Sequence, residues 1–167
     1  IKQYTSSVST YTSAIEQNPS NPFLYLNRST TRAEMIDFIS SIDNSYQRIT
    51  IDSDPANRLN NNSKRTYNYD EAIADLNKAI KLFPDFAQAY YNRGNLEALS
   101  GRLPEAFENY SKAIELNPSF AEAYYNRGVI QIFMKDTRKG CLDLSKAGEL
   151  GILEAYEMLK RYASADN

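Results

Sequence analysis

The chain has 167 residues, and its 19 lysines and arginines against 21 aspartates and glutamates give a formal net charge of −2. This balance provides no basic surplus for a phosphate backbone, so a nucleic-acid-binding protein is not expected. The sequence contains no histidine, which removes the most common general base and most catalytic zinc sites. No apolar run approaches the ~20 residues of a membrane span. We therefore expect no enzyme, no cofactor, no metal site and no membrane insertion, while the cellular location stays open.

The chain opens with a segment that recurs later in the sequence. A helix is expected over Tyr4–Glu16, and its end, "YTSAIEQNP" at Tyr11–Pro19, resembles "YSKAIELNP" at Tyr110–Pro118. Because proline cannot continue a helix, both copies indicate a helix that ends at the same position of a shared repeat. No matching first helix precedes Tyr4, so the segment is interpreted as half a repeat and the chain as the C-terminal part of a longer array.

The second repeat carries a long insertion. "PFLYLNRS" at Pro22–Ser29 aligns with "AQAYYNRG" at Ala87–Gly94. The distance along the chain from Pro22 to Ala87 is almost twice the distance from Ala87 to the next copy at Ala121. The first helix of this repeat is expected to run on for several turns, because helical spacing continues through Met35, Ile39, Ile42, Tyr46 and Ile49. The stretch 52–68 is polar and rich in Asn and Ser, which is typical of a loop. A tolerated loop and a functional insertion both fit this composition.

Two tandem repeats of equal length follow. Seven of the eight residues of Ala87–Gly94 recur in Ala121–Gly128. Apolar residues of Asp70–Phe83 recur at steps of three and four, which predicts a helix, and Pro84 and Pro118 end the helices before them. The sequence "SFAE" after the second proline has the spacing of a capping box, which predicts that a new helix begins there.

This pattern resembles the tetratricopeptide repeat family, of bacterial type. The third repeat carries the family's aromatic, small and proline positions at Tyr90, Gly94, Ala106, Ala113 and Pro118. The fourth carries them at Tyr124, Gly128, Gly140 and Ala147, with Ile152 in place of the proline. Gly140 and Ile152 are departures, which are expected where an array ends.

The resemblance implies an all-α fold, a right-handed superhelix of tandem antiparallel helix pairs with a long insertion in the second repeat. We expect one array over residues 1–163. Its parts are a half repeat at 1–21, a repeat at 22–86 with an insertion at about 30–68, repeats at 87–120 and 121–151, and a capping helix at 152–163. Repeat arrays need such polar caps for solubility.

In this family the first helix of each pair lines a concave face that holds a peptide. Carried over to this sequence, the expected peptide-binding or partner-binding residues are Leu26, Tyr91, Asn95, Leu99, Glu122, Tyr125, Val129 and Phe133. Tyr91 and Tyr125 are the leading candidates, because tyrosine offers a large contact area at little entropic cost and a hydroxyl group. An alternative is that some of these residues pack against the insertion or the C-terminal helix.

Family members that capture acidic chaperone tails use a clamp of Lys, Asn, Asn, Lys and Arg. The corresponding slots here hold Leu26, Thr30, Asn92, Glu122 and Asn126. Because Glu122 would repel a carboxylate, this clamp is not expected. The resemblance instead implies a non-catalytic scaffold that binds a peptide or a partner protein. The alternative is a structural or self-association module whose insertion fills or extends the groove.

Arg93 and Arg127 occupy one slot of the repeat and are expected to lie near the second helix of the preceding repeat. Their predicted partners there are Asp75 and Asn109, respectively. An arginine–carboxylate pair at this point would tie neighbouring repeats together.

Overall fold

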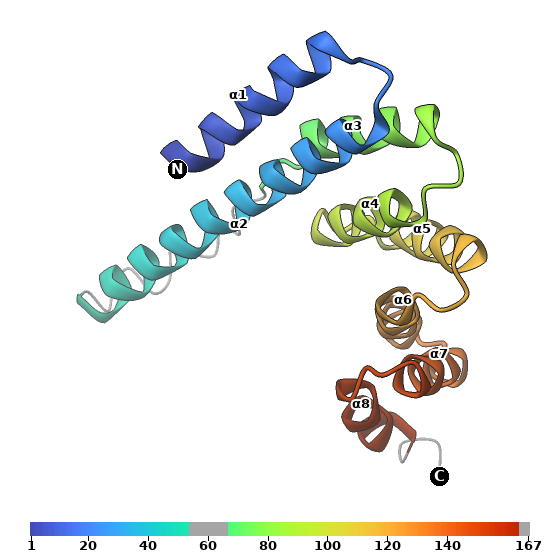
Figure 1. Ribbon diagram of the computed structural model, residues 1–167. Coiled ribbons are helices and arrows are strands. Elements are labelled where there is room, and N and C mark those ends of the chain that lie inside the picture. The colour runs from blue at the N-terminus through green and yellow to red at the C-terminus, as the bar shows by residue number, and fades with distance from the viewer. Residues whose placement is uncertain (54–66, 164–167) are drawn as a thin grey trace. The chain divides into compact units, whose positions relative to one another are not determined.

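The computed structural model describes the backbone of residues 1–53 and 67–163, and side chains over 1–41 and 67–162. Within these residues all regular structure is helical, which confirms the all-α prediction. The helices are α1 (Lys2–Gln17), α2 (Pro22–Ser53), α3 (Asp70–Leu82), α4 (Ala87–Leu99), α5 (Leu103–Leu116), α6 (Ala121–Phe133), α7 (Thr137–Glu149) and α8 (Glu154–Ala163) (Figure 1). They form two compact units, an N-terminal unit over Ile1–Leu82 and a C-terminal unit over Phe83–Asn167, which are described separately.

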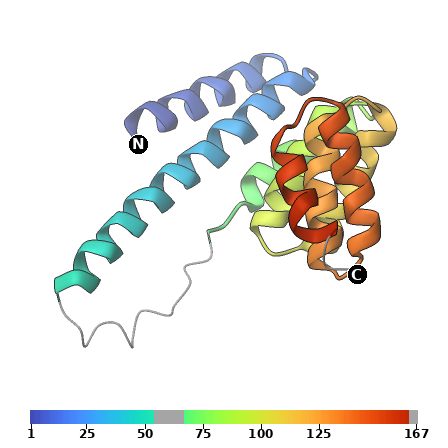
Figure 2. The ribbon, with the colours of Figure 1, turned by 90° about the horizontal axis from the view of Figure 1, so that it is seen from below.

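The N-terminal unit is built around the long helix α2. Helices α1 and α2 lie side by side and antiparallel (Figures 1 and 2), and α2 packs on α3 as well. The start of α2 is fixed by Tyr25, which is buried and donates a hydrogen bond from its hydroxyl to the carbonyl oxygen of Pro19 at 3.1 Å. The predicted extension of this helix is confirmed, since α2 reaches Ser53. The loop predicted for 52–68 lies largely outside the described residues.

The C-terminal unit consists of two helix pairs and a closing helix. Helix α4 packs on α5, α6 packs on α7, and α8 covers α7. Alanines lie in the core of these pairs, and Ala106, Ala113 and Ala147 have no exposed surface. The closing helix α8 begins at Glu154, two residues later than predicted. Ile152, just before it, and Leu159 within it pack against a buried cluster that contains Ala147.

Small residues set the distance between paired helices. A Cβ atom added to Gly128 would lie 2.9 Å from the carbonyl oxygen of Gly140. One added to Gly94 would lie 2.7 Å from the ring of Tyr110. Both distances are shorter than a van der Waals contact, so these glycines allow an approach that a side chain would prevent.

The capping box predicted for "SFAE" is wrong, although the helix does begin there. Helix α6 starts at Ala121 with Phe120 as its N-cap residue, so Ser119 lies one position too early to cap it. The turn is held instead by Asn117, whose side-chain oxygen accepts a hydrogen bond from the Ser119 amide at 3.1 Å. Such an Asx turn satisfies the backbone locally and leaves the N-cap position to an apolar residue.

None of the helices within residues 1–53 and 67–163 is both long enough and apolar enough to cross a bilayer.

Candidate peptide-binding groove

An open groove in the C-terminal unit brings together five of the eight predicted binding residues. It has a volume of about 660 Å³. The predicted residues that line it are Asn95, Leu99, Tyr125, Val129 and Phe133. The other lining residues are Ala98, Leu103, Tyr110, Asn126, Ile130 and Met158. This volume lies within the range of small-molecule and cofactor pockets.

Helical spacing explains why these side chains share one surface. Asn95 and Leu99 are four residues apart on α4, and Tyr125, Val129 and Phe133 follow one another at four-residue steps on α6. Residues four apart lie on the same face of a helix, so each helix presents one stripe to the groove. Leu99 is 59% exposed and Phe133 is 74% exposed. Large apolar side chains gathered on a surface are typical of interaction sites.

Beneath this apolar surface lies a small hydrogen-bonded network. The Tyr110 hydroxyl donates to the side-chain oxygen of Asn95 at 2.8 Å. The Asn126 amide donates to the same oxygen at 3.0 Å and to the Tyr91 hydroxyl at 3.3 Å. Burial raises the pKa of Tyr110 well above its usual range, so the phenol stays protonated and remains a donor. The network fixes the orientation of Asn95 from below.

Three predicted residues lie outside the lining of this groove. Tyr91 is half-buried, with its ring centroid 5.8 Å from that of Tyr110 and 4.7 Å from that of Phe120. Glu122 is exposed in the first turn of α6. Leu26 belongs to α2 of the N-terminal unit. For these residues a binding role stays a prediction.

Sequence reasoning missed several groove residues for identifiable reasons. Met158 lies on α8, which is outside the repeat pattern, so no position of the repeat points to it. Tyr110 lies on the second helix of its pair, where the family resemblance implies packing only. Asn126 occupies a slot of the acidic-tail clamp but is not among the expected binding residues, and its place in the lining and its contact with Asn95 put it at the groove.

A repeated arginine supports the helix pairs. Arg127 makes a two-point contact with Asp143, at 2.7 and 2.8 Å, and its third donor reaches Ser111 of the preceding pair at 3.2 Å. Arg93 donates to the side-chain oxygen of Asn109 at 2.8 Å. The predicted pairing of Arg127 with Asn109 is therefore wrong. The two oxygens of a carboxylate can accept two parallel N–H hydrogen bonds from a guanidinium, whereas a side-chain amide has a single oxygen. This difference favours Asp143 as the partner.

The same arrangement occurs in the N-terminal unit. Arg28 donates to both carboxylate oxygens of Asp75, at 2.9 and 2.5 Å, and to Thr12 of the preceding helix at 3.1 Å. Arg32 also pairs with Asp75. The predicted pair of Arg93 with Asp75 would join the two units and stays a prediction.

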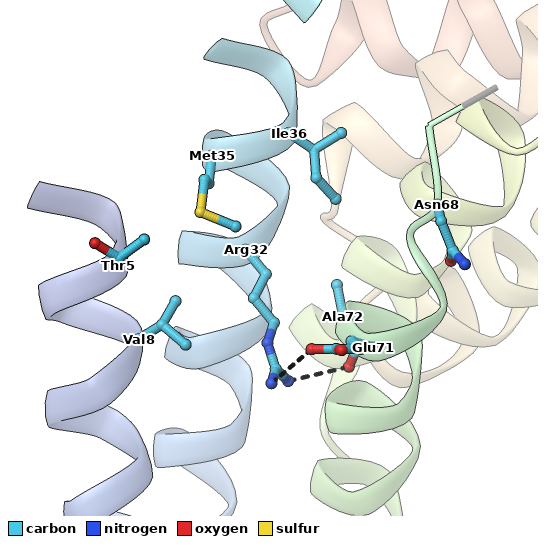
Figure 3. Close-up of a pocket in the computed structure, with 8 residues that line it drawn as sticks. All are labelled: Thr5, Val8, Arg32, Met35, Ile36, Asn68, Glu71 and Ala72. Carbon is cyan, nitrogen blue, oxygen red and sulfur yellow. Dashed lines mark hydrogen bonds and ion pairs between the residues drawn. The ribbon is translucent and has the colours of Figure 1, made fainter. Parts of the chain in front are cut away.

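A pocket of about 400 Å³ lies in the N-terminal unit, between α1, α2 and α3 (Figure 3). It is lined by Thr5, Val8, Arg32, Met35, Ile36, Asn68, Glu71 and Ala72. The guanidinium of Arg32 points across it towards α3 and forms an ion pair with Glu71 at 2.9 Å. The pocket's cation is thus neutralised by the chain itself, which leaves little electrostatic attraction for an anionic ligand.

Among the side chains of residues 1–41 and 67–162, no group of three or more Cys, Asp or Glu has the arrangement of a metal site.

Comparison with known proteins agrees with the helix pairs. A family model described as TPR repeat matches residues 68–98 and 94–132. Among solved structures, MamA is 19% identical over 99% of this chain and 80% of its own, with a TM-score of 0.71. YrrB, described as a TPR protein with an unusual peptide-binding site, is 22% identical over 89% of this chain and 62% of its own, with a TM-score of 0.60.

A third solved structure, the first TPR of Spaghetti (RPAP3) bound to an HSP90 peptide, is 25% identical over 58% of this chain and 79% of its own, with a TM-score of 0.55. No curated protein matches the sequence at a significant level.

Proposed function

Because the chain belongs to the tetratricopeptide repeat family, we propose that it is a non-catalytic scaffold that binds a peptide segment of a partner protein in the groove between α4 and α6. The observation that carries the proposal is that exposed apolar side chains gather next to the hydrogen-bonded network of Asn95, Tyr110 and Asn126. Proteins of this repeat fold are in general protein-interaction scaffolds, and two structural relatives are described with a bound peptide or a peptide-binding site.

The chemistry of the groove favours an apolar segment. Leu99 and Phe133 are largely exposed, and covering each such side chain contributes about 1.5–3 kcal/mol. The hydroxyl of Tyr125 and the amide of Asn95 supply polar groups at the groove, and both can pair with a peptide backbone. These contacts would orient the peptide, while the apolar stripes would supply most of the affinity.

The HSP90 peptide of the Spaghetti structure is not a good guide to the ligand. The slots of the acidic-tail clamp hold Leu26, Thr30, Asn92, Glu122 and Asn126 in this chain. These residues provide no cation for a terminal carboxylate, and Glu122 is an exposed acid. We therefore expect the partner segment to be apolar rather than acidic.

The alternative, a structural or self-association role for the insertion, concerns residues that include 54–66, which lie outside the described part of the chain. No observation favours it over peptide binding.

The test uses peptides selected from a display library against the full chain, with affinities measured by fluorescence anisotropy. Leu99→Asp places a charge in the groove, whereas Leu142→Asp places the same charge on α7 at another exposed leucine. We expect Leu99→Asp to weaken binding at least about tenfold, or about 1.4 kcal/mol, and Leu142→Asp to leave it nearly unchanged. Equal losses for the two variants would contradict the proposal.

A further inference from the structure

A second cavity of the C-terminal unit has a different composition from the groove. It has a volume of about 610 Å³ and lies where the beginning of α5 meets the end of α6 and the beginning of α7. Its lining residues are Pro104, Glu105, Phe107, Glu108, Gln131, Met134, Asp136 and Lys139. None of the described residues lines both this cavity and the groove. We call it the α5–α7 cavity.

Gln131 contributes an unusual polar atom to this cavity. The residue is only 8% exposed. Among the described residues, its side-chain oxygen Oε1 is the buried side-chain atom that has no hydrogen-bond partner. Buried polar atoms are almost always satisfied, because leaving one unpaired destabilises the fold. Gln131 lines the cavity, and its side-chain oxygen is an acceptor that no described residue of the chain uses.

The preceding repeat shows which kind of donor binds the side chain at this slot. Glu97 occupies the slot of that repeat that Gln131 occupies in the last one, and it is 9% exposed and bound by the Nε of Arg102. Arg102 and Asp136 likewise share one slot of the two repeats. In the last repeat an acid therefore replaces the arginine that would fill this site. Asp136 instead caps α7, accepting from the Lys139 amide at 3.4 Å.

The charges around the cavity also favour a cation. Three carboxylates line it, those of Glu105, Glu108 and Asp136, against one ammonium group. That ammonium belongs to Lys139, whose side chain is 70% exposed and pairs with Asp136 at 2.8 Å. The guanidinium of Arg127 lies 6.0 Å from the ring of Phe107, but it is held by Asp143.

From these observations we propose that the α5–α7 cavity binds an arginine side chain of a partner protein. The guanidinium donates to Oε1 of Gln131, in the place that Arg102 occupies against Glu97 in the preceding repeat. Glu105 and Glu108 balance its charge, and Phe107 and Met134 cover its apolar stem. This is a second interaction site, separate from the peptide-binding groove, and it selects for a basic residue rather than an apolar one.

The three methionines of the chain make the test specific, because each lines a different cavity. Met35 lines the N-terminal pocket, Met134 the α5–α7 cavity and Met158 the groove. The full chain labelled with ¹³C at its methionine methyl groups is titrated with the peptide acetyl-Ala-Leu-Arg-Leu-Ala-amide. The control peptide has citrulline, the neutral isostere, in place of arginine. We expect the arginine peptide to shift the Met134 signal and to bind at least about fivefold more tightly than the control.

Variants separate the proposed contact from general attraction of charge. Gln131→Met removes the acceptor at similar volume and should weaken binding of the arginine peptide, whereas Gln131→Glu adds a carboxylate and should strengthen the preference for arginine over citrulline. Asp136→Arg rebuilds the internal pair of the preceding repeat and should abolish the Met134 shift. Asp85→Arg makes the same change of charge at an exposed residue outside the cavity and should leave the shift in place.

Three results would overturn the proposal. The first is equal binding of the arginine and citrulline peptides at Met134, and the second is binding of the arginine peptide that is unchanged in Gln131→Met. A shift of Met158 alone would place the peptide in the groove, which contradicts this site and leaves the proposed peptide-binding function standing.

Discussion

Replacement of Gly140 by alanine tests how closely α6 and α7 are packed. Alanine is the family's residue at this slot, and the family resemblance alone favours the change. The structure predicts the opposite. A Cβ atom at Gly140 would lie 2.5 Å from Cγ1 of Ile132 and 2.7 Å from the carbonyl oxygen of Gly128. The carbonyl belongs to the backbone of α6, so it cannot move without separating the two helices.

The expected change in the free energy of unfolding follows from two opposing effects. Overpacking of a core costs about 1–3 kcal/mol, while alanine gains about 1 kcal/mol over glycine in a helix. We expect Gly140→Ala to lower the free energy of unfolding by up to about 2 kcal/mol. Each kcal/mol corresponds to a fall of about 4–8 °C in the melting temperature for a unit of this size. Urea unfolding of the full chain, followed by circular dichroism at the helix band, measures the change.

The control is Ala106→Gly, the reverse change at the same slot of the preceding repeat. Ala106 has no exposed surface, so this change removes a packed methyl group and should also destabilise the chain. Each repeat would then prefer its own residue. A Gly140→Ala variant that is more stable than the unmodified chain would refute the close approach of α6 and α7.

Two further changes test the polar contacts within each unit. Asp75→Ala leaves the guanidinium groups of Arg28 and Arg32 without their shared carboxylate. We expect the free energy of unfolding to fall by about 2–3 kcal/mol. This is less than the full cost of breaking a buried pair, because both arginines keep some contact with solvent. A change in the urea midpoint no larger than that of a surface mutation would contradict this. Tyr110→Phe removes the hydroxyl that donates to Asn95, and we expect it to lower the free energy of unfolding by about 1 kcal/mol. An unchanged melting temperature would show that Asn126 alone satisfies that oxygen.

The regular part of the fold could be predicted from the sequence because the repeat spacing constrains it. Ala113 occupies a small position of the repeat and Tyr25 aligns with its aromatic position at Tyr90, and both Ala113 and Tyr25 are buried. The start of α6 was predictable, but its capping was not. Ser119 has the chemistry of an N-cap residue, and only the backbone shows that the helix begins one position too late for it.

The candidate groove was predictable where it follows helical spacing and unpredictable where it depends on contacts between distant residues. Leu99, Val129 and Phe133 are positions that the family resemblance implies for the groove, and all three line it. The contact of Asn126 with Asn95 joins residues 31 positions apart. The partner of Arg127 was missed for a related reason. Asn109 and Asp143 lie at similar distances along the chain on either side of it, and only the folded geometry selects Asp143.

The most direct test of peptide binding is the methionine methyl spectrum of the full chain with a display-selected peptide. Met158 lies in the groove, next to residues of α4 and α6, while Met35 and Met134 lie in other cavities. If the groove between α4 and α6 is the peptide site, the Met158 signal shifts with the peptide concentration, and the shift is lost in Leu99→Asp. A selected peptide that binds tightly while the Met158 signal stays unchanged would contradict the account.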